Sequence, residues 1–140
     1  MSEVKKAAFT FEGYQVKKFT FEEPIDHKSD SFTLAFEPSG VYTESTGIFQ
    51  LKFDFRTFIQ GNLEQDVITA EVIGDFKFID KVPFEEIPDY FYKNSIAIVF
   101  PYLRAFVSTL TFQANIKPII LPVMNLGGLE ETFRKKTIKN

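Results

Sequence analysis

The sequence lacks cysteine and tryptophan and has one histidine among its 140 residues. Without cysteine it forms no disulfide, holds no thiolate-bound metal and offers no thiol nucleophile. The histidine, His27, lies in a polar segment between Asp26 and Lys28. No nucleophile-elbow pattern accompanies it, so we interpret His27 as an exposed structural residue and not as a catalytic base.

The acidic residues and glycines form no pattern typical of an active site either. The acidic pairs Glu22-Glu23, Glu85-Glu86 and Glu130-Glu131 are adjacent in sequence. Neighbouring side chains on a strand point in different directions, so we interpret these pairs as solvated surface. Gly127-Gly128 lacks the flanking residues of a phosphate-binding loop and is interpreted as a connector. We therefore expect no catalytic residue, no metal site and no cofactor.

Excess charge of one sign and long apolar runs are also scarce. The net charge of −3 argues against a dedicated nucleic-acid-binding protein, which would carry a clustered basic face. Arg104 and Lys117 interrupt the most apolar stretch, so we expect no membrane span. The N-terminal residues lack the apolar core of a signal peptide, and the expected location is the cytoplasm.

Phenylalanine is the residue present in surplus, with 18 copies beside 5 tyrosines. A chain of this size has few places to bury so many aromatic rings. Either an oligomer buries the surplus, or part of it forms a binding surface.

The first half of the chain alternates between apolar and polar residues, which predicts four strands of a mostly antiparallel sheet. The apolar positions are Phe9, Phe11, Tyr14, Val16, Phe19 and Phe21, then Phe32, Leu34 and Phe36, then Phe49, Leu51, Phe53 and Phe55, and last Ile68, Ala70, Val72, Phe76 and Phe78. The alternation changes parity after Phe11 and again after Val16, which predicts bulges in the first strand. Gly74 marks another possible bulge.

From Asp89 onward apolar residues recur every three or four positions, which predicts a helix. The helix has roughly 25 residues, which corresponds to about 37 Å, and Pro101 lies inside it. Its apolar surface covers most of the circumference, and one sheet covers only one side. A second chain is the simplest way to cover the apolar helix surface that the sheet leaves exposed. We expect the row Ile98, Tyr102 and Phe106 to form that oligomer interface.

Beyond the helix, Pro118 and Pro122 predict an extended segment, and the residues after Gly127-Gly128 predict a short C-terminal helix. The sequence thus predicts one α+β domain over residues 1–140. A four-stranded antiparallel sheet would pack on the long helix, with the short helix at its side.

Three motifs resemble those of the SecB family of protein-export chaperones. I-V-F-P-Y-L-R at 98–104 is similar to the family's L-F-P-Y-A-R, and I-L-P-V-M-N-L at 120–126 to its L-A-P-V-N-F. F-T-F-E-E-P at 19–24 resembles its I-S-F-E-A-P. The order of strands and helices resembles that of the family over roughly residues 9–133.

The resemblance implies an ATP-independent holdase that assembles as a homotetramer, a dimer of dimers, and binds non-native polypeptides in apolar grooves. The residues that it places in or beside the groove are Phe32, Leu34, Phe36, Ile68, Ala70, Val72 and Phe133. Binding one long client in several grooves would raise its avidity.

Docking to the SecA motor is the family property that fits this sequence least. Glu22 and Glu71 match acidic docking positions, but Lys18 stands where an acid is expected, and the last helix is basic. Two alternatives remain open. The first is a SecB-like chaperone dedicated to the antitoxin of a toxin–antitoxin system. The second is a domain that holds an apolar small molecule between sheet and helix.

Overall fold

The computed structural model describes residues 8–23, 32–59 and 65–140. His27 and the polar segment around it, which we interpreted as exposed, lie outside the described residues. The strands are β1 (Phe9–Phe21), β2 (Thr33–Thr43), β3 (Ile48–Ile59), β4 (Gln65–Phe78) and β5 (Thr137–Lys139). The helices are the 3₁₀ turn η1 (Phe84–Glu86), α1 (Asp89–Gln113), η2 (Leu126–Leu129) and α2 (Glu130–Lys135).

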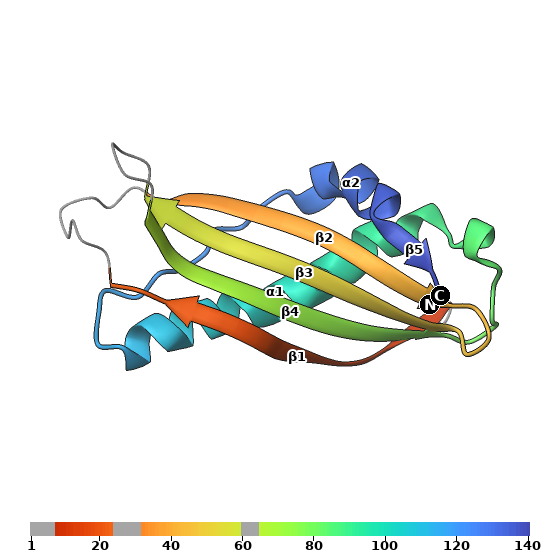
Figure 1. Cartoon of the computed structure of the whole chain (residues 1–140), viewed down its shortest axis with the longest axis horizontal. Helices are drawn as coiled ribbons and strands as arrows, with labels where there is room; N and C mark the ends of the chain where they lie inside the picture. Colours follow the sequence, from red (N-terminus) through yellow and green to blue (C-terminus); the bar gives the residue numbers. More distant parts are fainter. Residues whose placement is uncertain (1–7, 24–31, 60–64) are drawn as a thin grey trace, which may run out of the picture.

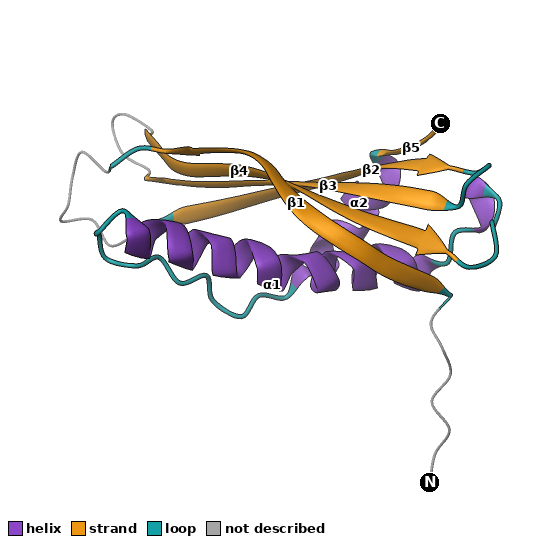
Figure 2. Ribbon diagram, turned by 90° about the horizontal axis from the view of Figure 1, so that it is seen from below, coloured by secondary structure: helices purple, strands orange, loops and turns teal. Residues whose placement is uncertain are grey.

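The molecule has two layers, a twisted sheet and the long helix α1 beneath it (Figures 1 and 2). The strand order in the sheet is β1-β4-β3-β2-β5. The alternation in β3 is confirmed, because Phe49, Leu51, Phe53 and Phe55 are buried. These apolar residues and the buried row of α1 share one core. The α+β class is therefore confirmed.

The two bulges predicted in β1 are confirmed. The register with β4 shifts between Phe11 and Gly13 and again between Val16 and Lys18. A shift of one residue moves the following side chains to the other face of the sheet. Each of these two shifts therefore returns the next apolar residues to the face that packs on α1. Tyr14 and Phe19 consequently meet α1, although they differ in parity.

The prediction of a four-stranded antiparallel sheet is wrong in one respect: the sheet has five strands and is mixed. The three residues of β5 pair in parallel with Gly40, Val41 and Tyr42 of β2. Their sequence is too short to show a strand period. Tertiary contacts hold them instead, including the 2.7 Å ion pair between Lys139 and Glu44.

A bulge at Gly74 was also predicted wrongly, because β4 pairs without a break through Gly74 to β3. The glycine serves the packing of α1. A Cβ at this position would lie 2.7 Å from Cγ2 of Val99 on the helix. The missing side chain lets α1 approach the sheet.

Helix α1 has the predicted bounds, with Pro101 exposed in its interior. By length and composition alone α1 is able to cross a membrane, a weak criterion that the core helix of a soluble protein also meets. The absence of a membrane span therefore stays a prediction. Segment 116–125 then runs back along α1 in an extended form (Figure 2). Its Ile119 amide donates to the Thr111 hydroxyl at 2.9 Å.

Candidate polypeptide-binding surface

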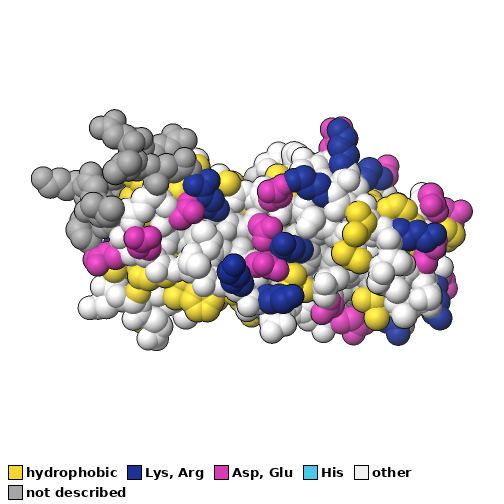
Figure 3. All heavy atoms as spheres, in the orientation of Figure 1, with side chains coloured by type: hydrophobic (Ala, Val, Ile, Leu, Met, Phe, Trp, Pro, Cys, Tyr) yellow, Lys and Arg dark blue, Asp and Glu magenta, His cyan; other side chains and the backbone are white. Residues whose placement is uncertain are grey.

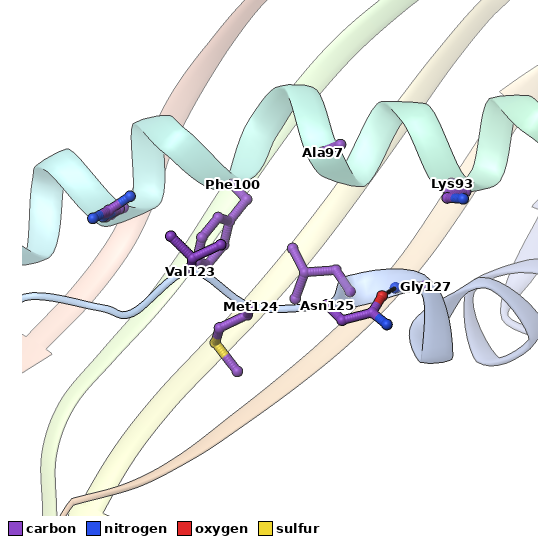
Figure 4. A pocket seen from close by; sticks show the side chains of 9 residues that line it. Lys93, Ala97, Phe100, Val123, Met124, Asn125 and Gly127 are labelled. Atoms are coloured by element: carbon purple, nitrogen blue, oxygen red, sulfur yellow. Dashed lines mark hydrogen bonds between the residues drawn. The ribbon is translucent and has the colours of Figure 1, made fainter.

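A hollow of about 280 Å³ opens between α1 and the start of the C-terminal region (Figure 4). It is lined by Lys93, Ala97, Phe100, Arg104, Val123, Met124, Asn125, Leu126 and Gly127. Figure 4 shows the Phe100 ring of α1 beside Val123, whose exposed fraction is 89%. The Asn125 side chain accepts a 3.1 Å hydrogen bond from the Gly127 amide and so fixes the turn into η2. The hollow is thus open, mostly apolar and built on ordered elements.

One predicted groove residue of β2, Phe36, lies next to this hollow. Phe36 packs edge-on against Phe100, with ring centroids 6.0 Å apart. It also stacks on Phe53 at 5.5 Å, so its position is set by the core. Leu34 on β2 and Phe32 just before it are half-buried against the core. Of these three predicted residues, Phe36 is the one that contacts a residue of the hollow, and sequence reasoning did not identify the hollow itself.

The other predicted groove residues lie in the core of the chain. Ile68 and Val72 are fully buried, and Ala70 is 5% exposed. Phe133 is fully buried between Phe49 at 5.6 Å and Tyr92 at 5.1 Å. Their contact with a client stays a prediction, and it requires the sheet and helices to open.

A second apolar patch lies near the C-terminal end of α1. Ser108, Thr109, Phe112, Pro118 and Ile120 line it, and Phe112 and Ile120 are each 68% exposed. Sequence reasoning missed Ile120 and Val123. Ile119 and Leu121 are buried while Ile120 between them is exposed. All three residues are apolar, so no alternation in the sequence distinguishes the uncovered side of this extended segment.

The residues predicted for the oligomer interface contact β1 of their own chain. Tyr102 stacks on Tyr14 with ring centroids 4.2 Å apart, and Phe106 meets Phe19 edge-on at 5.2 Å. Ile98 is half-buried beside them. Tyr14, Phe19 and Tyr102 nevertheless keep exposed fractions of 46%, 50% and 38%. We call these three residues the aromatic surface.

The sheet face away from α1 carries charges of both signs (Figure 3). Glu71, a predicted docking position, lies 4.0 Å from the Lys52 ammonium and pairs in register with Lys18. Burial raises the pKa of the neighbouring Asp54, partly offset by Lys52. Glu22 is exposed at the end of β1, and its backbone amide donates to the Val67 carbonyl. Both predicted docking acids are present, but a basic neighbour reduces the negative potential around Glu71.

Candidate metal ligands do not gather in the described part of the chain, where no group of three His, Cys, Asp or Glu residues could hold an ion. The charged side chains there form ion pairs instead, such as Arg134 with Asp89 at 2.7 Å.

No family model matches the chain. It is 42% identical over 76 residues to an uncharacterized protein of Methanocaldococcus jannaschii, a match covering 51% of this chain. That match spans about half, 48%, of the archaeal protein's length. The chain is also 27% identical over 122 residues to the protein-export protein SecB of Magnetococcus marinus, covering 81% of this chain and 76% of that protein.

A solved structure has a similar fold. The SecB-like chaperone of Mycobacterium tuberculosis, in complex with a peptide from an antitoxin, superposes with a TM-score of 0.66 and 20% identity. The superposition covers 84% of this chain and 91% of that one. The fold is therefore SecB-like. The SecB resemblance seen in the motifs is confirmed by this fold and by the similarity to a SecB sequence.

Proposed function

We propose that this protein is an ATP-independent holdase chaperone that binds non-native polypeptides. The observation that carries the proposal is the open apolar hollow between α1 and residues 123–127, which adjoins Phe36 of β2. Each apolar side chain removed from water there would contribute roughly 1.5–3 kcal/mol. Such contacts do not read sequence, so many unfolded segments would bind.

Assembly of the protein as a dimer of dimers in the cytoplasm is part of this proposal. The aromatic surface supports it, because three exposed aromatic residues on one side of the chain favour a protein partner. Several hollows in one oligomer would hold one long client with higher avidity than a single hollow.

An antitoxin is the second candidate client. The solved SecB-like neighbour is bound to a peptide from an antitoxin, which supports a dedicated client for this fold. A general export role would instead involve the SecA motor. The mixed charge around Glu71 supports weak binding of that motor or none. A small-molecule site is less well supported, because the hollow is open and its residue Val123 is 89% exposed.

Light scattering tests the holdase proposal. We expect a several-fold molar excess of the chain to suppress aggregation of a chemically unfolded test protein. The Val123→Ser and Ile120→Ser double variant should suppress it less, because two exposed apolar contacts are lost. Ile138→Ser is the matched control, since Ile138 is 61% exposed on β5 and lines neither apolar site. No suppression by the unmodified protein would refute the proposal.

The same assay separates the two client classes. A general holdase suppresses aggregation of several unrelated unfolded proteins. A dedicated antitoxin chaperone suppresses aggregation of one antitoxin and leaves the unrelated proteins unprotected.

A further inference from the structure

Two basic side chains stand at opposite ends of the hollow. Lys93 and Arg104 both line it from α1, and the lining residues Ala97 and Phe100 lie between them in the sequence. Figure 4 shows Lys93, Ala97 and Phe100 along the helix. Eleven positions separate the two basic residues, which corresponds to about 16 Å along the helix axis. The other seven lining residues carry no charge. The hollow is thus an apolar surface with a cation at each end.

These two cations differ from the basic residues at the C-terminal end of the chain. Arg134 pairs with Asp89 at 2.7 Å, Lys135 with Glu131 at 2.9 Å and Lys139 with Glu44 at 2.7 Å. Within residues 8–23, 32–59 and 65–140, Lys93 and Arg104 make no ion pair.

The absence of a partner for Lys93 has a structural cause. Asp89, four residues before Lys93, is the acid that would normally pair with it across one helical turn. The carboxylate of Asp89 contacts Arg134 of α2 instead. Arg104 has no acidic residue three or four positions away on α1. Both charges are therefore left available to a bound molecule.

We infer that the hollow selects extended polypeptide segments in which apolar residues are flanked on both sides by acidic residues. An extended chain advances about 3.3 Å per residue and its side chains alternate between two faces. Carboxylates four residues apart, about 13 Å, therefore share one face and come within reach of the long side chains of Lys93 and Arg104. The inference rests on the proposed holdase function and names its client class. Because both basic residues are near the surface, each pair should raise affinity only about two- to fivefold.

Fluorescence anisotropy with three labelled peptides tests the inference. All three share one apolar centre, and two flanking positions four residues apart carry Glu, Gln or Lys. The Glu peptide should bind tightest and the Lys peptide weakest. The difference should shrink between about 0.02 and 0.5 M salt, because salt screens exposed charges.

Variants locate the effect. The Lys93→Gln and Arg104→Gln double variant should bind the three peptides almost equally, and Lys93→Gln alone should remove about half of the discrimination. Lys77→Gln is the matched control, because Lys77 is exposed and its neighbours Phe76 and Phe78 point into the core from the other face. Circular dichroism checks that each variant is folded.

The outcomes separate the inference from the function that it deepens. Equal binding of the three peptides by the unmodified protein overturns the charge selection and leaves the holdase intact. Discrimination that survives in the double variant also overturns it, since the charges would then act elsewhere. Binding of none of the peptides refutes both.

Discussion

Gly74 sets the distance between the sheet and α1. It lies in the middle of β4, where a glycine normally weakens a strand. Close packing offsets the destabilisation of the strand by this glycine, because Cγ2 of Val99 lies 2.7 Å from the place where a Cβ would be. The helix that carries Phe100 and the hollow is therefore positioned by one absent methyl group.

We predict that Gly74→Ala destabilises the folded chain by about 1–3 kcal/mol. The added Cβ would lie 2.7 Å from Val99 Cγ2, so the helix or the strand must shift. Urea unfolding followed by circular dichroism measures the change. Gly128→Ala is the control, because nothing lies within 4 Å of a Cβ there.

The double variant Gly74→Ala with Val99→Ala tests the cause of this destabilisation. Removing the Val99 methyl groups should make Gly74→Ala less costly than it is in the original chain, a coupling that a double-mutant cycle detects. Additive effects would show that the cost comes from the strand backbone and not from the helix contact.

The elements differ in how far the sequence determines them. The bulges of β1 were predictable, because a parity change after Phe11 leaves few other ways to keep the aromatic residues on one face. The strand β5 was not, because three residues show no period and the strand depends on its long-range pairing with β2. Phe36 was predicted as a groove residue, whereas Phe100, which it contacts at the hollow, was not. An apolar pattern around a whole helix does not indicate which row stays uncovered.

An ion pair attaches β5 to the rest of the chain, and another lies within α2. Lys139 on β5 pairs with Glu44 at 2.7 Å, and Glu44 also accepts a hydrogen bond from the Phe84 amide. The hydrogen bond from Lys139 is the larger cause that lowers the pKa of Glu44 below its usual 4.5, and the Phe84 amide adds to it. In α2, the hydrogen bond from Lys135 lowers the pKa of Glu131.

We predict that Lys139→Ala raises the pKa of Glu44 and leaves that of Glu131 unchanged, and that Lys135→Ala does the reverse. Titration of the carboxyl ¹³C signals by NMR measures both. A depressed carboxyl pKa stabilises the folded chain above the usual value of 4.5, and this contribution is lost as pH falls through the folded-state pKa. The attachment of β5 should therefore weaken in acid. An unchanged Glu44 pKa in Lys139→Ala would contradict the pairing.

On the scale of the whole molecule, β1 and α1 leave one side of the chain open. β1 is the outermost strand, and within the described residues its other edge pairs with no strand. A strand of 13 residues with such an edge is open to pairing with another chain. The aromatic surface of Tyr14, Phe19 and Tyr102 lies on the same strand and on the helix beside it. A second copy of the chain would cover both features at once.

We predict an oligomer at micromolar concentration that dissociates when a charge enters the aromatic surface. Tyr102→Glu places a carboxylate where the Tyr102 ring stacks on Tyr14, and burying that charge against a second copy would be costly. Sedimentation velocity should show a smaller species for this variant. Ile79→Glu is the control, because Ile79 is 59% exposed and follows β4 outside the aromatic surface. If the unmodified chain sediments as a monomer, α1 has no partner chain, and client binding must then be explained by single hollows without avidity.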